Sequence, residues 1–308
     1  MVAQARSWKD IYFTVRDGLR LYARHYPPPT VSRRKPVLCL AGLTRNSRDF
    51  HDLAVALSSG DAPRDVYALD YRGRGLSQHD PDWRNYTVQI EMLDVQDFIA
   101  LAALEKPAII GTSRGGLITM ALAAVQPGAV GAAVLNDIGP VIEQEGLIRI
   151  AGYVGKTPLP SSWEDAARMV ADLNRAAFPA VPDEQWAEVA RQWYNDNKGY
   201  PAPGYDPALA KTFTITDGPI PDLWPQFTAL NRVPLLVLRG ENSDILSAAT
   251  VAQMCARHPN CTAYTVRGQG HAPLLKDAET IGVIVKFLAE VDAKAEAAAI
   301  EQIPTTVA

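Results

Sequence analysis

The ten residues 107–116, PAIIGTSRGG, constrain the fold of this chain more than any other stretch. The apolar run at 108–110 is typical of a buried strand. An apolar pattern on almost every helical face follows and ends at a Pro-Gly pair. The Gly-x-Ser-x-Gly pentapeptide therefore falls where a strand turns sharply into a helix. Gly111 and Gly115 leave room for such a turn, and we expect Ser113 to adopt a strained backbone with its hydroxyl exposed.

Strand-like runs alternate with helical patterns over most of the remaining sequence. This alternation predicts an α/β fold with a mostly parallel central sheet that helices cover on both faces. An Asp17-Gly18 pair between two further runs near the start predicts a hairpin. The later strands are expected at Val37–Leu40, Val66–Leu69, Val130–Leu135, Val233–Leu238 and Thr262–Val266.

The alternation is lost between about Val141 and Pro225. This segment holds four of the six tryptophans and many prolines. We predict a helical cap at 141–225, inserted into an α/β core formed by 1–140 and 226–308. Ser161 and Asp183 are the expected N-caps of two cap helices. Trp186 and Trp193 lie on one helical stripe, which favours the core of the cap over the lining of a pocket.

Composition narrows the class of protein further. The 308 residues carry a net charge of −4 without a basic block, so we expect no nucleic-acid partner. No apolar run approaches the roughly 20 residues of a membrane span, and the start MVAQARSWKD lacks the apolar centre of a signal peptide. The three cysteines form no disulfide framework or zinc spacing, and Cys39 is expected in the core. These features favour a cytoplasmic protein that uses no metal and has no membrane partner.

A serine hydroxyl needs a base and a group that orients the base. Of the five histidines, only His271 lies in a Gly-flanked loop after the last expected strand, while the other four suit packing or surface positions. Two carboxylates, Asp244 and Asp137, follow strands that end at the same sheet edge, and Glu241 is a weaker third choice. Negative charge on an attacked carbonyl would be stabilised by backbone N–H groups, here those of Leu43 and Arg114.

Five stretches resemble the α/β-hydrolase fold superfamily from about Ile11 to Val291: PVLCLAGLTRNSRDF, VYALDYRGRGLS, IIGTSRGG, LLVLRGENSD and GQGHAPLL. The resemblance implies Ser113 as nucleophile, His271 as base and Asp244 as acid, in the chain order Ser, Asp, His, with Asp137 as the alternative acid. It also implies Leu43 and Arg114 as oxyanion donors and a cap after the sixth strand.

Two departures from the family pattern concern the same region. Many relatives have His-Gly where this chain has Ala41-Gly42, so the oxyanion loop is expected to be held differently. The Arg114 side chain is favoured as a structural partner of a carboxylate such as Asp137, the alternative being contact with an anionic substrate. The turn at 70–77, DYRGRGLS, is given a purely structural role.

The resulting prediction is a cofactor-free serine hydrolase that cleaves a small hydrophobic carboxylic ester or lactone through an acyl-enzyme. Carbon–carbon bond hydrolases and haloperoxidase-like enzymes carry the same triad and form the alternative. A hydrolase-fold receptor without catalysis is a third interpretation. The oligomeric state is left open, a homodimer being one option.

Overall fold

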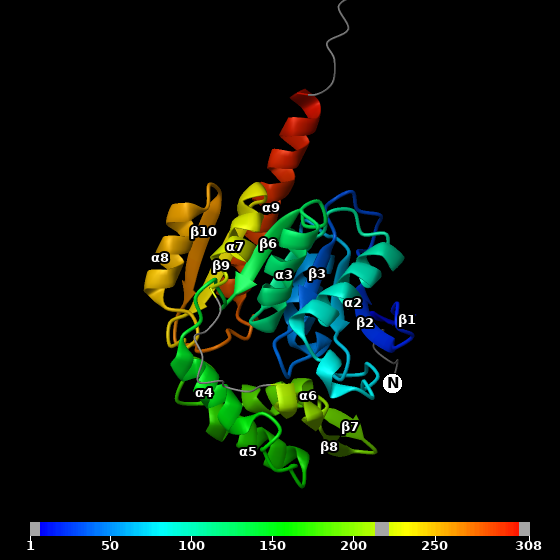
Figure 1. Ribbon diagram of the computed structural model, residues 1–308, viewed down its shortest axis with the longest axis vertical. Coiled ribbons are helices and arrows are strands. Elements are labelled where there is room, and N and C mark those ends of the chain that lie inside the picture. Colours follow the sequence, from blue (N-terminus) through cyan, green and yellow to red (C-terminus); the bar gives the residue numbers. More distant parts are fainter. Residues whose placement is uncertain (1–6, 213–221, 302–308) are drawn as a thin grey trace, which may run out of the picture.

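The computed structural model describes residues 7–212 and 222–301, and an eight-stranded sheet is its centre (Figure 1). Six neighbouring strands run parallel, and the hairpin of β1 and β2 joins their edge antiparallel. The spatial order is β1-β2-β4-β3-β5-β6-β9-β10. The strands are β1 (Lys9–Thr14), β2 (Arg20–Tyr26), β3 (Val37–Leu40), β4 (Val66–Asp70), β5 (Ala108–Thr112), β6 (Ala132–Asn136), β9 (Leu235–Gly240) and β10 (Cys261–Val266).

Helices pack on both faces of this sheet, which confirms the predicted fold class. Because successive side chains of a strand point to opposite faces, Ile109 joins one apolar cluster while Ala108 and Ile110 join the other. On the first face lie α2 (Val88–Leu101), α3 (Arg114–Val125), α7 (Trp224–Thr228) and α8 (Ala248–Arg257). On the second lie α1 (His51–Ser59) and α9 (Ala278–Glu301). Cys39 is fully buried, as expected.

The part of the chain from α4 to β8, between β6 and β9, forms a separate layer on one side of the sheet, at the bottom of Figure 1. It contains α4 (Gln144–Tyr153), α5 (Trp163–Asn174), α6 (Gln185–Trp193) and the small hairpin of β7 (Asn195–Asn197) and β8 (Tyr200–Ala202). Among the described residues, the 3-10 helices are η1 (Ser47–Phe50), η2 (Trp83–Asn85), η3 (Pro207–Thr212) and η4 (Ala229–Arg232). We propose that the layer from α4 to β8 is the cap. The predicted range 141–225 includes residues 213–221, which lie outside the described ranges.

Two predicted helix N-caps in this layer were each wrong by one residue. Ser162, not Ser161, caps α5 by accepting a hydrogen bond from the Asp165 backbone N–H. The two serines are adjacent and each has an acidic residue three positions later, so the sequence pattern fits both. The helix α6 begins after Glu184 and has no side-chain cap. Asp183 instead forms an ion pair with Arg175.

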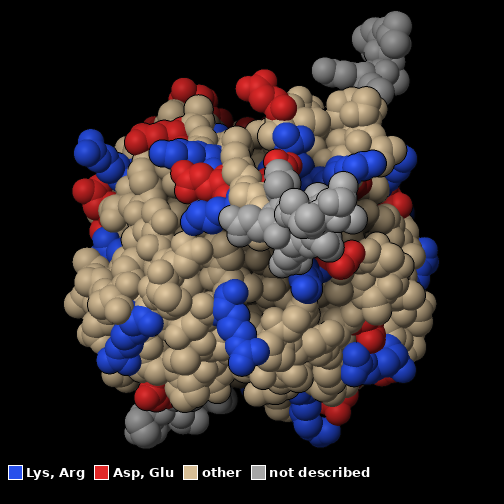
Figure 2. Space-filling model, turned by 90° about the horizontal axis from the view of Figure 1, so that it is seen from above, with Lys and Arg blue, Asp and Glu red and all other residues tan. Residues whose placement is uncertain are grey.

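Charged side chains of both signs are interspersed on the face that Figure 2 shows, with uncharged surface between them. This agrees with the mixed charge pattern of the sequence. Within the described residues, no helix combines the length and hydropathy required to cross a lipid bilayer.

Candidate active site

Ser113 occupies the strained turn that its flanking glycines predicted. It lies between β5 and α3 with φ 50° and ψ −112°. A Cβ on Gly115 would lie 2.1 Å from the carbonyl oxygen of Leu40, and one on Gly111 would lie 2.5 Å from the backbone of Gly115. Both positions therefore exclude any larger residue, and the close strand–helix contact that they allow fixes the serine at the end of β5.

His271 meets this serine across 158 positions of sequence. Its Nε2 lies 2.9 Å from Ser113 Oγ. The loop that carries the histidine is fixed by Asn136, whose amide donates to the carbonyl of Pro273 at 3.0 Å and to the hydroxyl of Thr112 at 3.1 Å. The structure thus brings together the two residues that the sequence analysis proposed as nucleophile and base.

The carboxylate that contacts the imidazole belongs to Asp137, directly after β6. Its Oδ2 lies 2.8 Å from His271 Nδ1 and also accepts a hydrogen bond from Ser243 Oγ at 2.5 Å. Its Oδ1 accepts from the backbone N–H of Gly240 at 2.7 Å. Asp137 is fully buried and adopts a positive φ of 58°, which turns its side chain from the end of β6 toward the histidine loop. Three donors thus fix its orientation.

Asp244, the preferred acid in the sequence analysis, makes a different contact, so that preference is corrected. Both of its oxygens face Arg149 of α4, at 2.5 and 2.8 Å. Burial raises the pKa of Asp244, but the hydrogen bond and charge of Arg149 outweigh it and lower the pKa below the ordinary carboxyl value. Glu241 is likewise occupied elsewhere, since it accepts from the backbone N–H of Gly268 at 2.7 Å.

The expected oxyanion donors lie on two segments beside the serine. Arg114 is the first residue of α3, so its backbone N–H has no acceptor within the helix. Leu43 lines the cavity described below, and its carbonyl accepts from Arg74 Nε at 2.9 Å. The Tyr71 hydroxyl donates to the carbonyl of Ala41 at 3.2 Å. Side chains of the turn after β4 therefore hold the loop that contains Ala41 and Leu43.

The turn at 70–77 thus has a structural role, as expected. Its buried Asp70 accepts from the backbone N–H groups of Ser47 at 2.6 Å and Leu76 at 2.8 Å. This carboxylate joins the turn to η1, the segment that follows the oxyanion loop. Its position accounts for the tight fit of Gly75, where a Cβ would lie 1.9 Å from Asp70 Oδ2.

The Arg114 side chain also has the structural contacts that the sequence analysis favoured, with a different partner from the one suggested. Its Nε lies 2.5 Å from Glu91 Oε2 and its Nη2 donates to the carbonyl of Tyr86 at 3.0 Å. The fully buried Glu91 also pairs with Arg74 at 2.7 Å. Glu91, not Asp137, is therefore the carboxylate that balances Arg114.

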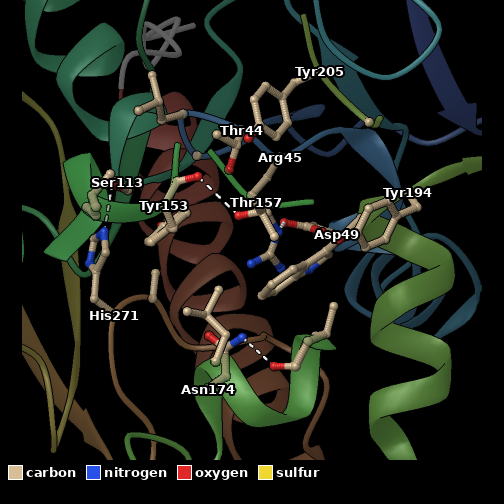
Figure 3. Close-up of a pocket in the computed structure, with 18 of the residues that line it drawn as sticks. Thr44, Arg45, Asp49, Ser113, Tyr153, Thr157, Asn174, Tyr194, Tyr205 and His271 are labelled. Carbon is tan, nitrogen blue, oxygen red and sulfur yellow. Dashed lines mark hydrogen bonds and ion pairs between the residues drawn. The ribbon is translucent and has the colours of Figure 1, made fainter. Parts of the chain in front are cut away.

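A cavity of about 260 Å³ opens beside Ser113 and His271, between the sheet and the layer that contains α4 to α6. Its wall is mostly apolar and aromatic, with Tyr153, Tyr194 and Tyr205 among the lining residues (Figure 3). Trp186 is buried in the apolar core of the layer that contains α4 to α6, and Trp193 packs against the same cluster, as the helical stripe predicted. Trp193 also lines the cavity, because a helical stripe does not show which residues at its end face a neighbouring layer.

One charged pair in the cavity wall was also missed. Arg45 and Asp49 both line the cavity, with Arg45 Nε 2.7 Å from Asp49 Oδ2. Burial lowers the pKa of Arg45 and raises the pKa of Asp49 relative to their ordinary values. Sequence alone gave no signal for this pair, since an arginine in a polar loop is usually solvated. Over the described ranges, no three His, Cys, Asp or Glu side chains are grouped as metal ligands.

Comparisons with known proteins identify the family of this chain. The sequence profile of the Alpha/beta hydrolase family matches residues 37–283, and the chain belongs to this family. It is 34% identical over 261 residues to a 3-hydroxybutyrate-oligomer hydrolase of Cupriavidus necator, covering 82% of this chain and 87% of that protein. It is 28% identical to a 2-(acetamidomethylene)succinate hydrolase of Mesorhizobium japonicum, covering 76% of this chain and 81% of that one. The crystal structure of an alpha/beta hydrolase from Novosphingobium aromaticivorans superimposes with a TM-score of 0.85 at 41% identity, covering 93% of this chain and 99% of that chain.

Proposed function

We propose that this chain is a cofactor-free serine hydrolase that cleaves short carboxylic esters through an acyl-enzyme. The observation that carries the proposal is the continuous hydrogen-bonded chain Ser113–His271–Asp137 at the wall of an apolar cavity. This arrangement has the contacts that nucleophilic catalysis by serine requires: a base within reach of the hydroxyl and a carboxylate that fixes the base.

In the proposed reaction, Ser113 Oγ attacks the ester carbonyl carbon while His271 Nε2 accepts the hydroxyl proton. The backbone N–H groups of Leu43 and Arg114 stabilise the oxyanion that forms, and one such donor contributes about 100- to 1000-fold in rate. When the tetrahedral intermediate collapses, the carbon–oxygen bond of the ester breaks and His271 returns the proton to the departing alcohol. Asp137 keeps the Nδ1–H of the ring oriented and stabilises the imidazolium.

The acyl-enzyme is then hydrolysed by water along the same route. His271 removes a proton from the water molecule as its oxygen attacks the acyl carbon. The second intermediate collapses, Ser113 regains its proton, and a carboxylic acid leaves. No group is oxidised or reduced in either half of the reaction, and water is the only co-reactant.

Two findings support a small ester as the substrate. The cavity volume of about 260 Å³ and its largely apolar wall suit a short aliphatic molecule. The relative from Cupriavidus necator is named for hydrolysis of 3-hydroxybutyrate oligomers, which are linear esters. We therefore propose short hydroxyalkanoate esters as the first substrates to examine.

The test compares wild type with Ser113→Ala on p-nitrophenyl acetate and butyrate and on the linear dimer and trimer of 3-hydroxybutyrate. Ser59→Ala, the same substitution at an exposed position of α1, is the matched control. We expect Ser113→Ala to abolish both hydrolysis and labelling by a fluorophosphonate, and Ser59→Ala to retain both. Undiminished hydrolysis by Ser113→Ala would overturn the proposal. A lactone and a vinylogous diketone in the same panel test the ring-opening and carbon–carbon alternatives.

A further inference from the structure

The cavity beside Ser113 contains a cation that the proposed chemistry does not use. Arg45 follows the oxyanion loop and its side chain is 20% exposed. The Cζ of its guanidinium lies 3.7 Å from the ring centre of Trp193, the last residue of α6. This stacking fixes the plane of the guanidinium where the segment around η1 meets the layer that contains α4 to α6.

Only one side of this guanidinium is occupied. Asp49 approaches Nε, and neither Nη atom of Arg45 hydrogen-bonds to any residue that the structure describes. The buried Arg72 shows the alternative within the same protein. Its Nε and Nη2 bind Asp94, and its Nη1 binds both Asp17 and Asp80. The Nη groups of Arg45 are thus available for a ligand, whereas the corresponding groups of Arg72 donate to carboxylates of the protein.

Arg45 is also close to the proposed nucleophile. Gly42 separates them: a Cβ at that glycine would lie 3.6 Å from Arg45 Cγ and 3.8 Å from Ser113 Cβ. Figure 3 shows Ser113 and His271 on one side of the cavity and Arg45 with Asp49 on the other. Because both pairs line one small cavity, a single short molecule reaches the hydroxyl and the guanidinium together.

The second arginine in the cavity wall is less suited to bind a ligand. Arg149 already directs Nε and Nη2 to the two oxygens of Asp244, and its side chain is 39% exposed. Asp49, which would repel an incoming anion, lies on the Nε side of Arg45 and has Arg48 and Lys276 as further positive neighbours. Tyr153 is the other titratable group that acts on Arg45. Arg45 therefore lines the cavity with Asp49 at its Nε and with both Nη groups available to a ligand.

We propose that Arg45 binds a free carboxylate of the substrate, so that this site takes short esters that also carry an acid group. The inference rests on the proposed ester hydrolysis and names the substrate class within it. A charge-assisted, two-pronged contact in a partly desolvated cavity both orients the ester at Ser113 and selects against neutral molecules of the same shape. It also compensates the desolvation of the guanidinium, which lowers the pKa of Arg45.

The experiment uses two matched substrate pairs. The first pair is 3-acetoxybutanoate and its methyl ester, and the second is monomethyl succinate and dimethyl succinate. In each pair the neutral member carries a methyl ester in place of the carboxylate. The two pairs place that group on the alcohol portion or the acyl portion of the ester whose cleavage is measured, by release of acetate in the first pair and of methanol in the second. We expect wild type to prefer the acid in at least one pair. Arg45→Gln should lower kcat/KM for that acid by about 10- to 100-fold, mainly through KM, and change the neutral ester little.

Two further variants separate binding from folding. Arg45→Gln leaves Asp49 without its partner, so Arg45→Gln/Asp49→Asn restores a neutral pair and should show the same loss on the acid substrate. Arg45→Lys keeps the charge without the planar fork and should retain part of the preference. Thermal denaturation and circular dichroism confirm that each variant is folded.

A binding measurement makes failure of this inference distinguishable from failure of the proposed function. Butanoate should bind to Ser113→Ala, measured by calorimetry, and should bind about 10-fold or more weakly when Arg45→Gln is added. Esters cleaved equally well with and without a carboxylate, together with butanoate binding that ignores Arg45, would overturn the inference and leave ester hydrolysis standing. Butanoate binding that depends on Arg45 without cleavage of any ester would support the anion site and overturn the proposed function instead.

Discussion

His271 Nδ1 lies 2.8 Å from Asp137 Oδ2, and this carboxylate comes from the end of β6. Two groups hold the Asp137 carboxylate in place. The backbone N–H of Gly240 lies at the end of the neighbouring strand β9, and the hydroxyl of Ser243 lies in the loop that follows. Since β6 lies between β5 and β9, the histidine loop reaches a carboxylate next to the nucleophile strand. The chain therefore has two acidic residues near the imidazole, of which one contacts it and the other pairs with an arginine.

Because Asp137 contacts His271 and Asp244 does not, an aspartate-to-asparagine substitution should have different effects at the two positions. Asp137→Asn should lower kcat for p-nitrophenyl butyrate by about 10⁴-fold, because a carboxamide neither enforces the tautomer of His271 nor stabilises its cationic form. Asp244→Asn should lower it by less than about 10-fold, since Asp244 pairs with Arg149 and not with the ring. Steady-state kinetics of both variants, with circular dichroism as a check on folding, make the comparison. A larger loss in Asp244→Asn than in Asp137→Asn would return the role of acid to Asp244.

The pair formed by Asp244 and Arg149 should contribute to stability in a pH-dependent manner. The pKa of Asp244 is lowered in the folded chain, so its contribution is complete above the ordinary carboxyl pKa of 3.8 and is lost as pH falls through the folded pKa. We expect Asp244→Asn to reduce the free energy of unfolding at pH 7 by about 1 kcal/mol or less, because the pair is partly exposed. Thermal denaturation at pH 7, 5 and 3.5 should show the difference from wild type shrinking at the lowest pH.

The control for this measurement is Asp172→Asn. Asp172 forms a longer contact with Arg175, at 3.9 Å, and both side chains are more than half exposed. It should change stability little at any of the three pH values. An Asp244→Asn deficit that grows as the solution becomes more acidic would contradict the lowered pKa.

The glycines of the nucleophile turn should tolerate no added methyl group. In Gly115→Ala the new Cβ would lie 2.1 Å from the backbone oxygen of Leu40, so either β3 or α3 must shift. We expect a loss of about 1–3 kcal/mol or more in unfolding free energy. Gly282→Ala is the matched control, since nothing lies within 4 Å of that Cβ position on the exposed side of α9. It should be neutral or should stabilise the helix by up to about 1 kcal/mol, measured by urea denaturation. Equal stability of the two variants would be inconsistent with the observed close contact.

The nucleophile turn was predictable because its requirements are local. Gly111 and Gly115 are needed within two positions of Ser113, and the strand and helix that give the motif its meaning are its immediate neighbours in sequence. The alternation of continuous apolar runs with helical patterns likewise predicted the sheet, because the strands of a parallel sheet covered on both faces are apolar throughout. His271 followed from its place in a glycine-flanked loop after the last strand.

The remaining features depend on how separate segments meet. Asp137 and Asp244 both follow strands that end at one sheet edge, and only the turn geometry at each decides which carboxylate reaches the ring. Arg45 and Trp193 stack in the cavity wall because the fold brings the end of α6 against the loop after β3. No sequence pattern links the two residues, because β4 to β6 and the first helices of the helical layer lie between them along the chain.

The loop that contains Leu43 is held by Arg74, and a last prediction concerns this contact. Arg74 Nε donates to the Leu43 carbonyl at 2.9 Å, and its Nη1 donates to the carbonyl of Arg72 and pairs with Glu91. Arg74→Gln removes the direct support of the loop that is proposed to bind the oxyanion. We expect kcat for p-nitrophenyl butyrate to fall by about 10- to 100-fold, less than the full loss of an oxyanion donor, because the loop keeps its hydrogen bond from Tyr71 to Ala41.

Arg114→Gln provides the matched control, because Arg114 is the other cation bound to the buried Glu91. Both variants take one positive partner from this carboxylate, so both should lower thermal stability to a similar extent. Only Arg74→Gln loosens the Leu43 loop, since the backbone N–H of residue 114 is unaffected by a change in its side chain. A fall in kcat shared equally by the two variants would show that the cost arises from Glu91, whereas a fall confined to Arg74→Gln locates it in the loop that faces the attacked carbonyl.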